Sequence, residues 1–571
     1  MLEKYINAAA KRSKADIVLK NARFVNTLTG KIQAGDIAIC GDRIVGIGSY
    51  EGQREYDMSG LTVLPGFIDS HVHIESSMLS PEEYAALVVP RGTTSVIADP
   101  HEITNVCGMD GVEYIYKASQ SVPLDVHIQL PSCVPATPFE TSGAILSGDD
   151  IAVGICRSEV FGLGEFMNFP GVIGADGDVI KKLEAAHRAG KIIDGHAPCV
   201  TGDDLNAYLC GGISTDHECA TPEEMEVKAD AGVYVQLRHS SSIHDIAANC
   251  KAVNCGNMRR FLMCTDDRHA ADLRTKGHID DALRTVVAAG LDPVWAVTIA
   301  TLNAAQCYDL KWRGAIAPFY FADLAVVDDL QHFNVQYVFK NGVPVAQSGK
   351  PLFDTSKRYL PQSVLNTVHI NELKLEDFVL KLKGQRARVM TLVPGTVLTG
   401  CEVMNVRSAN GDVVPENDVL KLAVVERHKY TGNIGKGLLK GYGFKGGALG
   451  ITVAHDSHNI IILGDDNASM AKAANCLRDI GGGMVIVESA TGAVHSLTLD
   501  IGGLMSSRSA DELIAESSAL YERAYAMGTD RRLAAFMTLA FLSLAVIPHV
   551  KLLDTGLFDV DKFCFTDINA E

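Results

Sequence analysis

The chain has 571 residues, of which 47% are hydrophobic and 21% are charged, and its formal net charge is −18. A chain of this length and composition is expected to fold into two to four globular domains with buried cores. The excess of acidic over basic residues argues against a nucleic-acid or anionic-membrane surface, because such surfaces recruit Lys and Arg. A small neutral or cationic ligand remains compatible with this charge.

The N-terminal segment, MLEKYINAAAKRSKADIVLKN, is amphipathic and lacks the apolar core of a signal peptide. The longest apolar run, residues 533 to 547, is too short to span a membrane and is interrupted by Thr538 and Ser543. We interpret this run as a buried helix. The cysteines are scattered singly, which favours reduced thiols. These features predict a cytoplasmic protein that binds no membrane.

Short β-strands are predicted from residue 15 to about residue 64, where runs such as GDIAICGDRIVGIG are separated by Gly, Asp and Asn. A similar pattern, ADLAVVDDLQHFNVQYVFKNGVPV, appears at residues 322 to 345. Two β-rich pieces that flank a long central segment suggest one small domain built from both. We therefore assign residues 1–64 and 313–361 to a small β-sandwich domain.

The central segment, residues 65–312, alternates short apolar runs with helical stretches. Its eight apolar runs are LPGFIDSHVH, TTSVIADPHE, LDVHIQLPSC, VFGLGEF, KIIDGHAP, ISTDHE, VYVQLRHSS and FLMCTDD. Alternation of strand and helix implies parallel strands joined by crossover helices, and eight such units over about 250 residues fit an α/β fold of the (β/α)8 TIM-barrel type. Residues 362–571 change to a polar and then glycine-rich composition, and we assign them to a separate C-terminal α/β domain.

Polar residues close most of these runs, and in such barrels the catalytic groups lie at the C-terminal ends of the strands. His71 and His73 are spaced i, i+2, so both imidazoles point to one side of a strand and can reach one ion. Five of the eight ends carry a histidine, which favours a metal site over separate structural histidines. The other polar residues at these ends are Asp99, His101, Glu102, Glu165, His196, His217, Glu218, Arg238, His239, Asp266 and Asp267.

Imidazole nitrogen and carboxylate oxygen together suit Zn, Mn and Fe(II). The residues expected as ligands are His71, His73, Glu165, His196, His217 and Asp266. With its two oxygens, Glu165 is placed as a bridge between two ions, which at a separation of about 3.5–4 Å would activate a shared water. Three histidines outside this pattern are expected to be structural: His187, His244 and His278.

Several motifs resemble those of a known family. PGFIDSHVHIESSML, VIADPHEITNVCG, GLGEFMN, GHAP and TDHE, with AHDSHNIIILGDD near the C-terminus, are similar to the amidohydrolase superfamily and, within it, to the bacterial adenine deaminases. The resemblance extends over essentially the whole chain. HVH alone is typical of the entire superfamily, whereas IADPHE together with GLGEFMN and AHDSHN is specific.

The resemblance implies hydrolytic deamination of adenine to hypoxanthine and ammonia, in which a metal-activated hydroxide attacks C6. It also implies a binuclear centre of Mn²⁺ or Fe²⁺, with Zn²⁺ also compatible, held by the six ligands above. Asp266 would serve in addition as the general base. Glu102 is favoured over His101 and Asp99 as the proton donor to N1. Contacts with the purine are expected from Asp99, Arg238 and Glu218.

One departure from the family pattern concerns the end of the seventh run, which reads RHSS from Arg238 to Ser241. Arg238 matches the Arg-Glu-Gly-Ser type of sequence common in the family, but His239 does not match its glutamate. The departure affects the expected orientation of the substrate more than the metal centre. His455 and His458 of AHDSHN either reach over the barrel mouth or only pin the C-terminal domain, and the sequence leaves both open.

Two alternatives to adenine deamination remain. The first is an amidohydrolase reaction on another aminopurine or on a cyclic amide, for which the metals and Asp266 would be shared. The second is a non-catalytic scaffold, which is disfavoured because every expected type of ligand is present. The expected partner is a small purine rather than a nucleic acid, and we expect a homo-oligomer, most simply a dimer.

Overall fold

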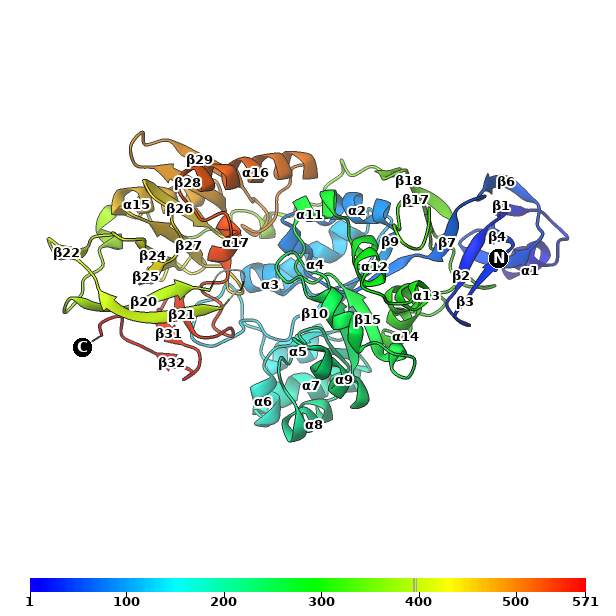
Figure 1. The fold of residues 1–571 in the computed structure, drawn as a ribbon, viewed down its shortest axis with the longest axis horizontal. Helices are drawn as coiled ribbons and strands as arrows, with labels where there is room; N and C mark the ends of the chain where they lie inside the picture. The colour runs from blue at the N-terminus through cyan, green and yellow to red at the C-terminus, as the bar shows by residue number, and fades with distance from the viewer. Residues whose placement is uncertain (394–395, 397, 571) are drawn as a thin grey trace.

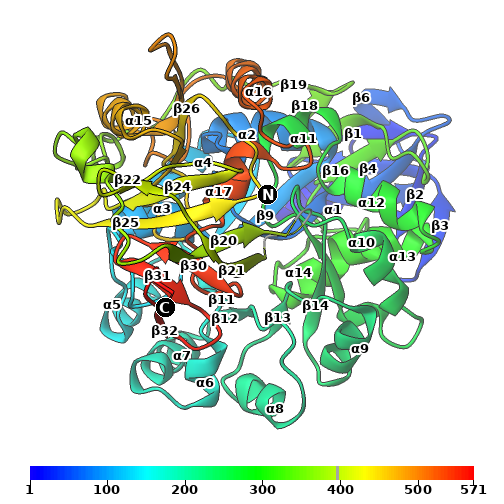
Figure 2. The same cartoon turned by 60° about the vertical axis from the view of Figure 1, so that its left-hand side comes forward.

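The structure is a computed structural model that describes residues 1–393, 396 and 398–570. In Figure 1 a barrel with its surrounding helices occupies the centre. A β-rich part that contains the N-terminus lies on one side of it, and a second sheet that contains the C-terminus lies on the other. Figure 2 turns this C-terminal part toward the viewer, in front of the barrel.

Eight parallel strands form the barrel. The first five are ordered β12-β11-β10-β9-β8 in one sheet and the last three β13-β14-β15 in another. Backbone hydrogen bonds join the sheets on both sides, from Ser214 N–H to Ile193 O (2.9 Å) and from Asp266 N–H to His71 O (3.0 Å). The strands are β8 (Phe67–Val72), β9 (Thr93–Ala98), β10 (Asp125–Leu130), β11 (Val160–Phe166), β12 (Ile192–Gly195), β13 (Thr215–Asp216), β14 (Tyr234–Arg238) and β15 (Phe261–Cys264). The predicted α/β barrel, including all eight apolar runs as strands, is confirmed.

Several helices around the barrel begin at capping residues that the sequence supplies. The Ser80 side chain accepts a hydrogen bond from Glu83 N–H, and Thr221 accepts one from Glu224 N–H. A proline occupies the first turn of both helices, where its missing N–H costs nothing. The main helices are α2 (Pro81–Val88), α3 (His101–Cys107), α4 (Met109–Ser119), α5 (Gly148–Gly154), α7 (Gly177–Ala189), α8 (Gly202–Cys210), α9 (Pro222–Asp230) and α12 (Ile279–Ala288).

Strands from both flanks of the barrel segment pair in one sheet, ordered β19-β18-β17-β16-β7-β2-β3. In it, β16 (Leu324–Val327) runs antiparallel to β7 (Thr62–Pro65). A second sheet, ordered β5-β4-β1-β6, shares a buried apolar cluster with it. The other strands are β1 (Ala15–Lys20), β2 (Arg23–Asn26), β3 (Lys31–Ala34), β4 (Asp36–Cys40), β5 (Arg43–Gly48), β6 (Gly52–Asp57), β17 (Val335–Lys340), β18 (Val343–Gln347) and β19 (Lys350–Pro351). The additional β-sandwich is confirmed, while its boundaries in the sequence stay a prediction.

The C-terminal part is built on an eight-stranded sheet ordered β21-β20-β25-β24-β27-β26-β28-β29. Helix α15 (Asn467–Asp479) packs on one face of it, and the other face belongs to the same apolar cluster as Ile74 and Ile103 of the barrel. The strands are β20 (Arg386–Leu392), β21 (Thr399–Asn405), β24 (Val419–Val425), β25 (Ile434–Lys440), β26 (Gly447–Ile451), β27 (Ile460–Gly464), β28 (Gly483–Glu488) and β29 (Val494–Thr498). The shared cluster fixes this sheet against the barrel.

The apolar run at residues 533 to 547 is mostly buried, as predicted, although Ala534 and Val546 are exposed, and only Ala535–Ala540 (α17) is helical. Beyond the helix the chain turns, and the Phe541 ring stacks on the His455 imidazole. The predicted helix was therefore too long, because this tertiary contact outweighs the helical propensity of the run. Within the described residues, no helix is both long and apolar enough to cross a membrane.

A buried lysine on α9 gives a test of how this helix is held against the barrel. Lys228 on α9 is fully buried and donates to Asp216 Oδ2 (2.8 Å) and Glu224 Oε1 (2.7 Å). Removing the ammonium leaves both carboxylates without their cation, which typically costs about 3–5 kcal/mol. We expect Lys228→Met to lower the apparent melting temperature by several degrees. Lys181→Met is the control, because Lys181 is exposed and its ammonium lies 3.5 Å from Asp149. Equal melting temperatures of the two variants would contradict a stabilising role of the buried lysine.

Candidate metal centre

Six side chains converge at the C-terminal mouth of the barrel. They are His71 on β8, His73 directly after β8, Glu165 on β11, His196 after β12, His217 after β13 and Asp266 after β15. Five of them are buried, whereas the His196 side chain keeps 21% of its surface exposed and marks the open side of the group. The sequence predicted each of these six residues as a ligand, and the structure brings all six together.

Glu165 lies between two pairs of histidines. Its Oε1 is 3.3 Å from His73 Nε2 and 3.9 Å from His71 Nε2. Its Oε2 is 2.8 Å from His196 Nδ1 and 3.3 Å from His217 Nε2. Each carboxylate oxygen thus faces a different pair, which is the arrangement that a bridging carboxylate requires.

Asp266 approaches the first pair from the other side of the barrel. Its Oδ1 is 3.5 Å from His71 Nε2 and 3.2 Å from His73 Nε2, while its Oδ2 accepts a hydrogen bond from Arg238 Nη1 (3.1 Å). The backbone of Asp266 is left-handed, with φ of 56°, a conformation that Asp tolerates better than most residues. One oxygen therefore faces the histidines, and the other is held by an arginine.

The protonation of His73 shows that its ring can serve as a ligand. His73 Nδ1 is 2.8 Å from the Asp99 carbonyl oxygen, which can only accept, so Nδ1 carries the hydrogen. In the neutral ring, the Nε2 lone pair then faces His71 Nε2 at 3.1 Å and the two carboxylates. Nitrogen lone pairs and carboxylate oxygens that converge in this way can share one cation. Donor atoms bound at about 2.0–2.2 Å to one ion are separated by about 3.0–3.5 Å, as here.

The ionisation of the side chains at this site also favours a bound cation. Burial favours neutral Glu165, yet hydrogen bonds from His101, His196 and His217 hold its pKa well below the usual range. Burial lowers the pKa of His73, but the nearby carboxylates raise it well above the ordinary value. A buried site with ionised carboxylates that attracts positive charge fits a divalent ion.

The loop after β9 supports these residues from behind. Asp99 Oδ2 accepts a hydrogen bond from Glu165 N–H (2.8 Å), a position that suits support of the ligands better than contact with a substrate. His101 Nδ1 lies 3.3 Å from Glu165 Oε1. Glu102 is hydrogen-bonded by two histidines of the C-terminal domain, His455 Nδ1 at Oε1 and His458 Nε2 at Oε2. AHDSHN therefore reaches the barrel mouth, a question that the sequence had left open.

Arg238 and Glu218, both expected to contact substrate, form an ion pair with each other. The same guanidinium holds Asp266, so Arg238 is already engaged on both sides. The Glu218 carboxylate, with 22% of its side chain exposed, is the more accessible of the two. His239, which departs from the family pattern, pairs with Asp281 of α12 (2.9 Å).

Of the three histidines expected to be structural, His278 is completely buried, with Nε2 3.0 Å from Asp69 Oδ2 and Nδ1 2.8 Å from Thr93 Oγ1. His187 lies on α7 and its Nε2 is 2.9 Å from the Gly211 carbonyl oxygen. These two histidines lie apart from the six converging residues, as predicted. His244 lines the cavity described next, so its surroundings differ from the expectation.

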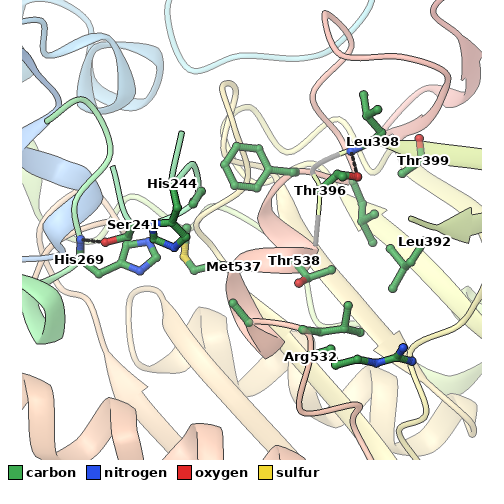
Figure 3. A pocket seen from close by; sticks show the side chains of 15 residues that line it. Ser241, His244, His269, Leu392, Thr396, Leu398, Thr399, Arg532, Met537 and Thr538 are labelled. Atoms are coloured by element: carbon green, nitrogen blue, oxygen red, sulfur yellow. Dashed lines mark hydrogen bonds between the residues drawn. The ribbon is translucent and has the colours of Figure 1, made fainter. Parts of the chain in front are cut away.

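A cavity of about 300 Å³ lies between the barrel mouth and the C-terminal domain. Figure 3 shows Ser241, His244 and His269 on one side of it, from the loops that follow β14 and β15, and Met537 and Thr538 of α17 facing them. These loops follow Arg238 and Asp266 directly in the chain. Phe541 also lines the cavity and stacks on His455, so the cavity wall touches one of the two histidines that hold Glu102.

Comparison with known proteins gives two family matches. The amidohydrolase family matches residues 62–345, and the adenine deaminase C-terminal domain matches residues 396–564. The adenine deaminase of Nitratidesulfovibrio vulgaris is 46% identical over 100% of this chain and 99% of its own length. That of Clostridium acetobutylicum is 44% identical over 99% of both chains, and that of Geobacillus kaustophilus is 42% identical over 100% of this chain and 99% of its own.

The position of Glu165 predicts how metal binding responds to substitution. Glu165→Gln preserves size but removes the negative charge and one oxygen donor. We expect it to lower the divalent metal bound per chain by at least about half, measured by elemental analysis after dialysis, because a bridging carboxylate serves both sites. His187→Ala is the control and should leave the metal content unchanged. Full metal content in Glu165→Gln would rule out the bridging position.

Proposed function

Because this chain belongs to the adenine deaminase family of the amidohydrolases, we propose that it hydrolyses adenine at C6 to give hypoxanthine and ammonia. Similarity at 42–46% identity over the whole chain carries this proposal, since it includes both the barrel and the C-terminal domain. The converging histidines and carboxylates agree with the metal dependence of this family.

We propose a binuclear centre. One ion would be held by His71, His73 and Asp266 and the other by His196 and His217, with Glu165 between them. Divalent ions in these positions supply Lewis-acid activation of the attacking water and of the purine. Mn²⁺ and Fe²⁺ are the ions we propose, and Zn²⁺ also accepts this set of donors.

Asp266 is the proposed general base. Arg238 holds its Oδ2, so Oδ1 is left to face the reacting water on the side of His71 and His73. Burial favours the neutral form of Asp266, but hydrogen bonds from His71 and His73 and the charge of Arg238 hold its pKa well below the ordinary value. An ionised carboxylate at this position can take the proton of the water and return it to the departing ammonia.

N1 of the purine must gain a proton as the ring loses aromaticity, and we propose His101 as its donor. Burial alone would raise the pKa of Glu102, but His455, His458 and His101 hold it well below the usual value, so its carboxylate carries no proton. Burial lowers the pKa of His101, yet Glu102 and the other carboxylates raise it well above the ordinary value. We therefore replace the preference for Glu102, drawn from the sequence, by His101.

The cavity between the barrel and α17 is the proposed route for the purine. Its volume of about 300 Å³ is at the lower end of the range for small-ligand sites. The Phe541 ring offers a flat apolar wall against which a planar base can stack. Glu218, at the exposed side of the centre, is the proposed acceptor for a purine N–H.

A panel of aminopurines tests the proposed substrate. Ammonia release is measured with adenine, adenosine, guanine, 2,6-diaminopurine and cytosine, using protein loaded with Mn²⁺. We expect adenine to have the highest kcat/KM, because a ribose would replace a purine N–H that Glu218 is proposed to accept. Absence of adenine turnover, together with turnover of another compound, would contradict the proposed function.

Asp266→Asn tests the proposed base. The amide keeps the size of the side chain but cannot accept the proton, so we expect kcat to fall by roughly 10²–10⁴-fold, the usual contribution of a general base. Circular dichroism and the melting temperature check that the fold is intact. Activity close to that of the parent would mean that the wrong aspartate has been assigned, and Asp267→Asn would be the next variant to measure.

A further inference from the structure

The loop between β26 and β27, residues 452–459, brings two histidines of the C-terminal domain onto one carboxylate of the barrel. His455 Nδ1 lies 2.5 Å from Glu102 Oε1, and His458 Nε2 hydrogen-bonds Oε2 of the same residue. All three side chains are at least 95% buried. Both oxygens of a buried carboxylate are thus occupied by imidazoles that stand more than 350 positions away in the chain.

The protonation of His458 distinguishes this group from the metal centre. His458 Nδ1 accepts a hydrogen bond from Ala454 N–H (3.0 Å), so in the neutral ring the hydrogen is on Nε2. Nε2 then donates to Glu102 and has no lone pair to offer an ion. This is the reverse of His73, whose Nδ1 donates and whose Nε2 is free. Histidine and carboxylate are here joined by hydrogen bonds rather than by a shared cation.

The loop is held rigidly by buried contacts of its own domain. Arg427, which is fully buried, donates to the His458 carbonyl oxygen, to Thr367 Oγ1 (3.1 Å) and to the Gly502 carbonyl oxygen (3.0 Å). The Phe541 ring stacks on the His455 ring, with centroids 4.7 Å apart and planes inclined by 22°. Neither imidazole can leave Glu102 without disturbing these contacts.

Glu102 in turn leads to the metal-binding residues. Its Oε1 is 3.5 Å from His101 Nε2, and His101 Nδ1 is 3.3 Å from Glu165 Oε1. The path from the C-terminal domain to the central carboxylate therefore has only two intermediate side chains, each one buried. A fixed position of Glu102 therefore restricts the orientation of the His101 ring beside Glu165.

We propose that His455 and His458 are positioning residues for the deamination: together they hold Glu102, and through it His101, so that the barrel without the C-terminal domain is an incomplete active site. This inference rests on the proposed function. It assigns no contact with the purine to either histidine.

Substitution of each histidine by Asn and, separately, by Gln tests the proposal. The amide nitrogen of Asn corresponds to Nδ1 of histidine, and that of Gln corresponds to Nε2. His455→Asn and His458→Gln therefore keep a donor to Glu102, whereas His455→Gln and His458→Asn displace it. We expect kcat for adenine to fall by about 10²-fold in the displaced pair, as for a misplaced catalytic group, and by less than about tenfold in the retained pair.

At position 455 the Asn variant should have the higher kcat, whereas at position 458 the Gln variant should. A loss of packing alone would not reverse the order between the two positions. His495→Gln is the control, because His495 also pairs with a carboxylate of this domain (Glu488, 2.8 Å) but lies exposed and away from the barrel. It should match the parent chain in kcat. Melting temperatures and bound metal are measured for every variant and are expected to remain close to those of the parent.

A double-variant cycle shows whether both histidines act through Glu102. In a Glu102→Gln background, His455→Gln and His458→Asn should each change kcat by less than about threefold, because the group that they position is already altered. Effects that multiply fully in the double variants would overturn the proposal. So would equal kcat for the Asn and Gln variants at each position, or an additional metal ion per chain that is lost in His458→Asn.

Failure of this proposal and failure of the proposed function are distinguishable. If the parent chain does not turn over adenine, the function itself is wrong, whatever the variants do. If the parent is active and the variants do not differ, only the positioning role is wrong.

Discussion

The structure depends on one buried carboxylate. Glu165 stands 2.8 to 3.9 Å from the nitrogens of five imidazoles, on side chains that come from four different strand ends. A buried carboxylate in such surroundings is stable only because positive charge is close, which protonated histidines or a bound cation can supply. The candidate metal ligands converge on this residue at the buried mouth of the barrel. The barrel fold brings them together by directing the C-terminal ends of its parallel strands toward one point.

The environment of Glu165 is organised in successive shells of contacts. Asp99 holds its backbone N–H, and His101 lies against its side chain. Arg238 fixes Asp266 on the opposite side, where it is itself neutralised by Glu218. The outermost contacts come from the C-terminal domain, whose buried Arg427 fixes the loop that holds Glu102. The C-terminal domain is therefore joined to the chemistry by hydrogen bonds as well as by the shared apolar cluster.

The sequence predicted the barrel and the six converging residues because both follow from local patterns. Apolar runs that alternate with helical stretches indicate parallel strands, and the rule that functional groups follow such strands selects His71, Glu165 and Asp266 without any structure. Contacts between distant segments were beyond these patterns. The pairing of Glu102 with His455, the engagement of Arg238 by Glu218 and the early end of α17 are all decided by tertiary packing. The proposal of His101 in place of Glu102 as the acid arises for that reason, since two histidines from another domain contact both oxygens of Glu102.

The central claim is that Glu165 joins two ions in one catalytic centre. Titration of the metal-free chain with Mn²⁺, with initial rates of adenine deamination measured after each addition, tests this claim most directly. The account predicts that activity rises until two equivalents per chain are bound and then stays constant. Full activity at one equivalent, with no further change up to two, would contradict it.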